Sequence, residues 1–183
     1  MLSLIFATSN EHKLKEAREI LGIEVEGTSL DIPEIQSLNE DEVVRQKAID
    51  YYDQIQKPLF VEDVSLTFHT LGKLPGTYIN DFSKQLGNEG LIKLLDGKDD
   101  RSATATVSIG YIHSDKKITV FQGSIEGSIA LEEKGEMGFG WDPIFIPEGE
   151  SQTFAEMDSD AKNRYSMRGI AFREFKKWLD RSR

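Results

Sequence analysis

Short apolar runs alternate along the chain with charged stretches in which apolar residues recur at helical spacing. The run Leu2–Ala7 predicts a buried strand, and a helix is predicted between Asn10, a suitable N-cap, and Gly22, a suitable stop. The apolar residues that share one face of this helix are Leu14, Ala17 and Leu21. The chain is therefore expected to open with a strand, a small polar turn and a helix.

The same patterns predict the elements of the remaining chain. In order, they are a strand at Ile23–Gly27, a helix at Asp41–Ile55, a strand at Leu59–Phe68, a helix within Phe82–Gly97 that covers at least Asn88–Asp96, a long hairpin of Ser102–His113 and Ile118–Ala130, a glycine-rich loop over 132–150, and an amphipathic helix at Asp160–Leu179 with Ala171, Phe175 and Trp178 inward. Strand–helix units followed by a hairpin predict a mixed α/β sheet flanked by helices. The hairpin would build a second lobe, with a cleft where strand ends meet loops.

Composition narrows the classes of protein that fit. With 183 residues, the whole chain 1–183 is expected to be a single domain with a sizeable core. A net charge of −10 argues against a general nucleic-acid binder. The absence of cysteine excludes disulfides, thiolate zinc sites and a cysteine nucleophile. No segment is apolar enough to span a bilayer and no basic leader is present, so a cytoplasmic protein without membrane partners is expected.

The opening turn is a candidate anion site. A strand that runs into a helix leaves N–H groups at the positive end of the helix dipole, and Lys13 adds charge one turn later. The alternative is an ordinary capped helix with a solvated lysine. The turn matches neither G-x-x-x-x-G-K-[ST] nor G-x-G-x-x-G, which argues against a nicotinamide-dependent oxidoreductase.

Three carboxylates are candidates for holding a divalent cation. Glu62 and Asp63 follow a buried apolar run, and Glu34 lies in an irregular loop after a short strand. Carboxylate oxygens of this kind can hold Mg²⁺ and leave room for water and phosphate. The alternative is that Glu34 is solvated and that the adjacent pair only ends a strand.

Two late segments carry candidate ligand contacts. In "GFGWDP", glycines allow close backbone approach, Phe139 or Trp141 could stack on a flat ring, and Asp142 could accept hydrogen bonds. In "AKNRYSMRG", Lys162 and Arg168 lie near a helix N-terminus, where cations are unfavourable unless an anion is bound. The alternatives are core aromatics in the first segment and a solvated helix face in the second.

Taken in order, these motifs resemble the inosine triphosphate pyrophosphatase family over nearly the whole chain. The matching stretches are "ATSNEHK", "PEIQ", "RQKA", "VEDVSL", "LPGTY", "FGWDPIF", "TFAEM", "KN" and "SMRG". The resemblance implies an elongated α/β fold with two lobes around a central substrate cleft, a homodimer and dependence on Mg²⁺. It also implies hydrolysis of ITP, dITP and XTP to a nucleoside monophosphate and pyrophosphate, which removes non-standard purines from the nucleotide pool.

The resemblance also implies roles for particular residues. The triphosphate would be held by Thr8, Ser9, Asn10, Glu11, His12, Lys13, Lys47 and Lys162. Glu34 and Asp63 would ligate the metal, and Asp63 would also be the catalytic base. The purine would be held by Phe139, Gly140, Trp141, Asp142, Ser166, Met167 and Arg168, with Phe139 stacked on it.

The sequence departs from the family pattern at a few of these positions. Ser9 replaces a glycine of the first turn, and Val64 replaces the Ser or Thr after the aspartate, so only its backbone N–H could donate to substrate. Met167 replaces a histidine expected near the base, and Asn80 a lysine found in some relatives. Val64 and Met167 motivate an alternative function, a nucleotide-binding sensor with little turnover or altered base selectivity.

Overall fold

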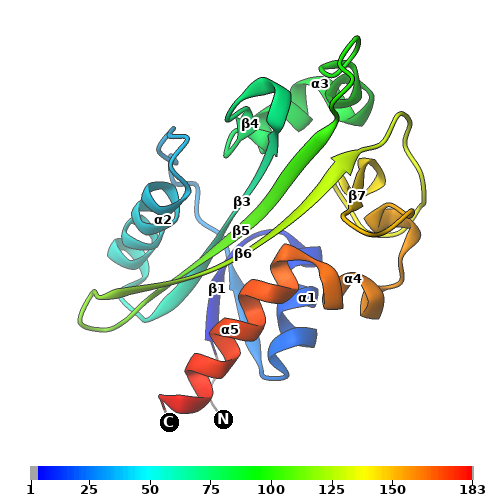
Figure 1. Cartoon of the computed structure of the whole chain (residues 1–183). Helices are drawn as coiled ribbons and strands as arrows, with labels where there is room; N and C mark the ends of the chain where they lie inside the picture. Colours follow the sequence, from blue (N-terminus) through cyan, green and yellow to red (C-terminus); the bar gives the residue numbers. More distant parts are fainter. Residues whose placement is uncertain (1–3, 183) are drawn as a thin grey trace. The chain divides into compact units, whose positions relative to one another are not determined.

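The computed structural model describes residues 4–182, and Figure 1 shows the course of the chain. The helices are α1 (Glu11–Leu21), α2 (Glu40–Ile55), α3 (Ile79–Lys93), α4 (Ser159–Tyr165) and α5 (Met167–Arg181). The strands are β1 (Leu4–Ala7), β2 (Val25–Thr28), β3 (Leu59–Phe68), β4 (Pro75–Gly76), β5 (Ser102–Ile112), β6 (Ile118–Ile129) and β7 (Phe145–Pro147). Leu2 and Ser3 of the first predicted strand lie outside the described residues. Within residues 4–182, no helix has the length and apolar character needed to cross a membrane.

The strands form a seven-stranded sheet in the order β2-β1-β3-β5-β6-β7, with β4 beside β3. Strand β1 pairs in parallel with β2 and β3, whereas β4 and β7 pair antiparallel with β3 and β6. The neighbours β5 and β6 are joined by the turn at 113–117. The predicted mixed α/β sheet and its long hairpin are therefore confirmed.

The chain divides into two compact units. Unit 1 contains the chain up to Asp63, Val107–Gly123 and the chain from Arg168 onward. Unit 2 contains Val64–Thr106 and Ser124–Met167. The boundary falls inside the long strands, so each of β3, β5 and β6 contributes residues to both units. The expectations of a single domain and of a central substrate cleft stay predictions.

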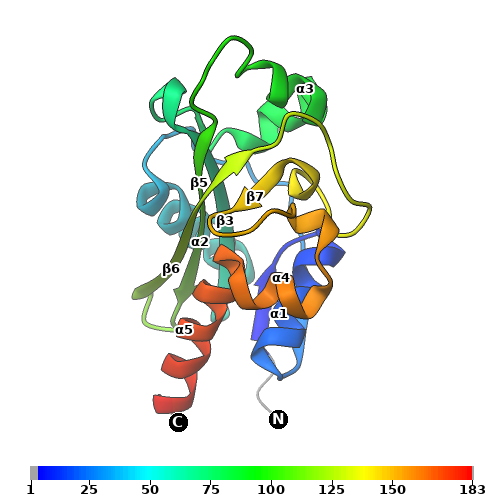
Figure 2. The ribbon, with the colours of Figure 1, turned by 45° about the vertical axis from the view of Figure 1, so that its right-hand side comes forward.

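In unit 1 the first half of β3 is buried between two helices. Leu59 and Val61 pack in one core cluster with Ala48 of α2. Phe60 points the other way, and its ring centroid lies 5.3 Å from that of Phe175 in α5. Figures 1 and 2 show α2 and α5 on opposite faces of these strands. Because side chains alternate along a strand, the next two residues of β3 also face different helices.

Both ends of α1 follow the predicted signals. The Asn10 side chain accepts hydrogen bonds from the N–H groups of His12 and Lys13, which caps the helix start. At the other end Gly22 adopts the left-handed conformation, with φ of 66°. Helix α2 begins within one residue of its predicted start, capped by Asn39. Local capping chemistry was sufficient to locate these ends.

The prediction of one continuous C-terminal helix was wrong. The chain forms α4 and α5, separated at Ser166, whose backbone is extended with φ −65° and ψ 148°. Ala171 and Phe175 are buried as predicted, and Trp178 is half-buried with its ring centroid 5.4 Å from that of Tyr111. The apolar periodicity continues past the break, which is why the pattern did not reveal it.

Two corrections also fall in unit 2. Helix α3 ends at Lys93, before the predicted Asp96, and is interrupted at Gly87. The glycine-rich stretch predicted to be all loop contains β7, which pairs with β6. The ring of Phe145 in β7 stacks on Phe154 with centroids 5.4 Å apart, and both residues are fully buried. Burial of this aromatic pair gives the short strand its place in the sheet.

Candidate functional site

Side chains of the opening turn bind three of its own N–H groups. The hydroxyl of Thr8 accepts from the N–H of Asn10 at 3.1 Å, and Asn10 in turn caps His12 and Lys13 at 3.0 and 3.2 Å. Ser9 does not adopt a positive φ, so this turn does not need a glycine there. An anion at the turn would compete with Asn10 for these donors. The proposed triphosphate roles of Thr8–Lys13 stay predictions.

Glu62 lies in a buried network of ion pairs in unit 1. Its two carboxylate oxygens accept from Nε and Nη2 of Arg168 at 2.8 and 2.9 Å, and Lys13 Nζ lies 3.0 Å from it. Glu16 completes the network by accepting from Nη1 of Arg168 at 2.7 Å. Two cations thus balance two carboxylates within α1, β3 and α5.

This network fixes the charge state of its members. Burial on its own raises the pKa of Glu62, but Arg168 and Lys13 outweigh it and lower that pKa to about 2. Burial lowers the pKa of Arg168, but Glu62 and Glu16 outweigh it and raise that pKa above its ordinary value. Glu62 is therefore engaged with cations rather than open to a metal. The guanidinium of Arg168 is hydrogen-bonded to Glu62 and Glu16. Its predicted contact with a purine stays a prediction.

Asp63, the next residue, is in a different environment. Its Oδ2 atom is buried and has no hydrogen-bond partner within the described residues. Burial raises the pKa of Asp63 to about 6, because Lys47 and Lys13 only partly offset desolvation while Glu34 and Glu62 add to it. A carboxyl group with a pKa of about 6 is mostly ionised at neutral pH and is suited to accept a proton from water.

Glu34, a predicted metal ligand, and Lys47, predicted to hold phosphate, form an ion pair in unit 1. Lys47 Nζ lies 2.6 Å from Glu34 Oε1, with 14% and 43% of the two side chains exposed. Both residues act on Asp63 electrostatically. The structure therefore brings together the predicted base, one predicted metal ligand and two of the predicted phosphate-binding lysines.

The carboxylates present fit a magnesium ion that takes most of its ligands from water and from the substrate. Among residues 4–182, no three His, Asp or Glu side chains are grouped closely enough to hold a metal by themselves. Mg²⁺ is usually held by one or two carboxylates together with waters and phosphate oxygens. The unpartnered Oδ2 of Asp63 is the donor that such an ion would need.

In unit 2 the predicted base-binding residues form a compact turn around Asp142. Its Oδ2 accepts from the N–H of Phe139 at 2.8 Å and from Lys162 Nζ at 2.7 Å. The Lys162 ammonium also lies 4.6 Å from the centroid of the Phe139 ring, a cation–π geometry. A Cβ at Gly138, where φ is +77°, would lie 2.2 Å from Asp142 Oδ2, so the turn requires glycine there.

The remaining predicted base contacts are buried. Trp141 is 8% exposed and packs with its ring centroid 5.6 Å from that of Phe145, whereas Phe139 is half-buried. Ser166 and Met167 at the α4–α5 break are 0% and 2% exposed, and Val64 is also buried. Phe139 is therefore the more open of the two aromatics that could stack on a ring. Lys162, predicted to hold phosphate, is 3% exposed and paired with Asp142, so that role stays a prediction.

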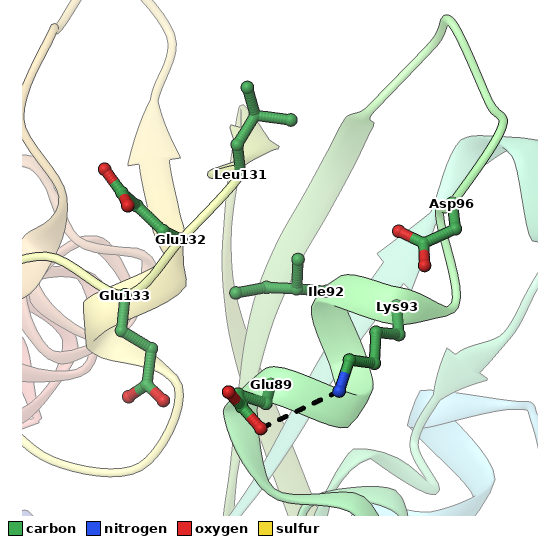
Figure 3. Close-up of a pocket in the computed structure, with 7 residues that line it drawn as sticks. All are labelled: Glu89, Ile92, Lys93, Asp96, Leu131, Glu132 and Glu133. Carbon is green, nitrogen blue, oxygen red and sulfur yellow. Dashed lines mark ion pairs between the residues drawn. The ribbon is translucent and has the colours of Figure 1, made fainter.

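Sequence reasoning missed residues that hold these side chains in place. Glu16 follows Lys13 by three positions on α1, a spacing that puts both on one face, and this was the available signal. Asn88 donates to the carbonyl of Gly140 at 3.1 Å, and its only sequence signal was the preceding glycine. A cavity of about 350 Å³ elsewhere in unit 2, between α3 and Leu131–Glu133, includes none of the predicted site residues (Figure 3).

Known proteins resemble this chain over nearly its whole length. A dITP/XTP pyrophosphatase of Hyperthermus butylicus is 41% identical over 179 residues, which cover 96% of this chain and 94% of the relative. An inosine triphosphate pyrophosphatase of Trypanosoma cruzi is 45% identical over 167 residues, covering 90% and 85%. Among solved structures, a HAM1 protein from Coxiella burnetii superposes with a TM-score of 0.85 at 28% identity, over 99% of this chain and 100% of that one.

The match to a known family rests on more than these pairwise similarities. The Ham1 family matches residues 4–178, from the first described residue of β1 almost to the end of α5. That span includes every residue singled out above in both units. The chain belongs to the Ham1 family.

Proposed function

We propose that this protein hydrolyses non-standard purine nucleoside triphosphates, namely ITP, dITP and XTP, to a nucleoside monophosphate and pyrophosphate with Mg²⁺. The proposal is supported by relatives named for dITP, XTP and inosine triphosphate pyrophosphatase activity at 41–45% identity. The observation that carries it is Asp63, a buried carboxyl with an unpartnered oxygen and a pKa of about 6 beside Lys13, Lys47 and Glu34.

Asp63 acts as the general base in this proposal. When ionised, it takes a proton from a water molecule as that water attacks a phosphorus of the α–β anhydride. The bond from this phosphorus to the bridging oxygen breaks, which yields the nucleoside monophosphate and pyrophosphate whichever of the two phosphorus atoms is attacked. Mg²⁺ held by Asp63 and Glu34 would supply positive charge to the phosphate oxygens.

Lys13 and Lys47 provide the cations that a triphosphate needs on an acidic protein. They are 17% and 14% exposed, so both are partly open to a ligand while paired with Glu62 and Glu34. Phosphate oxygens would compete with these carboxylates for the two ammonium groups. Charge-assisted bonds of this kind are stronger than neutral hydrogen bonds.

The turn Phe139–Asp142 would bind the purine in this proposal. Phe139 would stack on the ring, and donors facing position 6 would donate hydrogen bonds to the oxo group of hypoxanthine or xanthine. Adenine presents an amino group there, which would leave such donors unpaired at a cost of about 1–3 kcal/mol each. Selectivity against ATP would follow from this difference.

The test is pyrophosphate release with Mg²⁺, compared in parallel for ITP, XTP, dITP, ATP and GTP. We expect rapid release from the first three. Little release is expected from ATP, whose 6-amino group would leave the position-6 donors unpaired, and from GTP, whose base carries a 2-amino group that hypoxanthine and xanthine lack. A chelator should abolish release. Nucleotide binding without release from any of the five would instead support the sensor function.

We further propose that the protein acts in the cytoplasm as a homodimer, as the resemblance to the inosine triphosphate pyrophosphatase family implies. The mass of one chain is 20.7 kDa. Light scattering on the eluting protein should therefore give twice this mass. A mass of one chain at micromolar concentration would contradict the dimer without affecting the proposed reaction.

A further inference from the structure

The side chain of Asn88 ties α3 to the segment that leads into the proposed purine-binding turn. Its Nδ2 donates to the carbonyl of Gly140 at 3.1 Å and to the carboxylate of Glu133 at 3.0 Å. An amide nitrogen has two N–H donors, so these two contacts use both. Asn88 is half-buried, whereas Glu133 and Gly140 are exposed.

The backbone just before Asn88 is shaped to present this side chain. Gly87 interrupts α3 with φ 63° and ψ −179°, a conformation that is essentially restricted to glycine. Asn88 is consequently the first residue of the second helical piece of α3. Apart from its neighbours in the chain, no atom of the described residues lies within 4 Å of a Cβ built on Gly87, so glycine is required by the backbone angle and not by crowding.

The turn that Asn88 holds needs an external constraint. Gly138 and Gly140 flank Phe139 and both have positive φ, at 77° and 63°. Glycine has more conformational freedom than any other residue, so a turn with two glycines can readily adopt other shapes. Asp142 fixes the N–H of Phe139 from one side, and Asn88 fixes the carbonyl of Gly140 from the other.

We propose that Asn88 is a positioning residue for the purine-binding turn Gly138–Asp142. By holding Gly140, Asn88 sets the orientation in which the Phe139 ring stacks on the purine and the Asp142 carboxylate accepts hydrogen bonds. The inference rests on the proposed function, because it assigns the turn to the purine. Asn88 itself touches neither the purine nor the phosphates in this scheme.

The competing explanation is that Asn88 only closes one wall of the nearby cavity through Glu133. Figure 3 shows Glu132 and Glu133 on one side of that cavity, with Glu89 and Lys93 of α3 on the other. Variants can separate the two explanations. Glu133→Ala removes only the contact to Glu133, whereas Asn88→Ala removes both contacts, and Asn88→Asp keeps the size of the side chain but loses both N–H donors.

Hydrogen exchange of the full-length protein tests positioning without reference to activity. In Asn88→Ala and Asn88→Asp, amides of the peptide 137–143 should exchange faster by about 3- to 10-fold, the effect of one lost hydrogen bond. Glu133→Ala should accelerate exchange of this peptide less than either Asn88 variant does. Glu89→Ala, at the exposed next position of α3, should leave this peptide unchanged.

Kinetics then test the link to the purine. Both Asn88 variants should raise KM for ITP by about 3- to 10-fold and lower the preference for ITP over ATP, with a smaller change in kcat. Inhibition by pyrophosphate, which has no base, should stay at the wild-type value. The inference is overturned if amide exchange in 137–143 is unchanged in the Asn88 variants. It is also overturned if exchange is faster but the preference for ITP over ATP is unchanged. Absence of hydrolysis by the wild type overturns the proposed function instead, and exchange still decides whether Asn88 holds the turn.

Discussion

At the scale of single residues, Glu62 and Asp63 show how neighbouring carboxylates acquire different properties. Successive side chains of a strand point to opposite faces, so the two residues meet different surroundings. Glu62 is paired with Arg168 and Lys13, and its pKa falls to about 2. Asp63 has a buried oxygen with no hydrogen-bond partner among residues 4–182, and its pKa rises to about 6. Glu62 therefore keeps its charge at neutral pH, whereas Asp63 can exchange a proton.

Asp63→Asn should retain nucleotide binding and lose turnover. Removal of a general base typically lowers rates by about 10²–10⁴-fold, while the lysines proposed to bind phosphate are untouched. Pyrophosphate release measures kcat, and calorimetry with ITP measures binding. Asp180→Asn, an exposed carboxylate on α5, is the matched control and should keep wild-type kcat. A near-wild-type rate for Asp63→Asn would remove this residue from the mechanism.

At the scale of elements, the proposed purine-binding turn Gly138–Asp142 depends on glycines that are needed for different reasons. Gly138 and Gly140 both have positive φ, which disfavours any side chain. At Gly138 a Cβ would also collide with Asp142, whereas at Gly140 nothing lies within 4 Å. The two positions therefore separate backbone strain from the loss of the Asp142 contacts.

Gly138→Ala and Gly140→Ala should differ in their effect on purine binding. Both should lose about 1–2 kcal/mol of stability, because both force alanine into a left-handed conformation. Only Gly138→Ala should displace Asp142 from Phe139 and Lys162, and so raise KM for ITP by about tenfold or more. Chemical denaturation measures the stabilities of the two variants, and steady-state kinetics measure their KM values for ITP. Equal KM values in the two variants would show that Asp142 does not organise the turn.

At the scale of the whole molecule, the chain divides its candidate chemistry between two units. Unit 1 holds the ionisable groups suited to phosphate and metal, and unit 2 holds the aromatic turn suited to a flat base. The protein has a net charge of −10, so bound cations and local lysines must offset its repulsion of a triphosphate. Buried charges also make the stability of the molecule depend on pH.

Folding stability should carry two opposite contributions from Glu62 and Asp63. The folded pKa of Glu62, about 2, lies below its ordinary 4.5, so its stabilisation is present above pH 4.5 and is lost as pH falls toward 2. The folded pKa of Asp63, about 6, lies above its ordinary 3.8, so the folded state binds more protons there. Its effect is a loss of stability as pH rises from 3.8 through 6.

Urea denaturation of the two variants in the presence of a chelator should separate these contributions. Asp63→Asn should be more stable than wild type above pH 6, on the order of 1–3 kcal/mol, and the difference should vanish in mild acid. Glu62→Gln should be less stable near neutral pH by about 3–5 kcal/mol, because it leaves buried cations without a partner. If the unfolding free energy of each variant, plotted against pH, runs parallel to that of wild type at all pH values, both assignments are contradicted.

Much of the architecture could be predicted because it is encoded locally. Strand β3, helix α1 and its caps at Asn10 and Gly22, and the β5–β6 hairpin follow from periodicity and capping residues. The breaks at Gly87 and Ser166 could not be found this way, because the apolar pattern continues across them. Strand β7 was missed because its pairing with β6 is formed between segments far apart in the sequence.

For the candidate site, the sequence by itself determined which residues are available and, through ordered motifs, which family they resemble. Only the tertiary structure decided their partners: Arg168 on Glu62 and Glu16, Lys162 on Asp142, and Asn88 on Gly140. The reason is physical. Capping and strand alternation act over a few residues, whereas burial and ion pairing depend on which distant segments pack together, and these set the pKa of Asp63 and the shape of the Gly138–Asp142 turn.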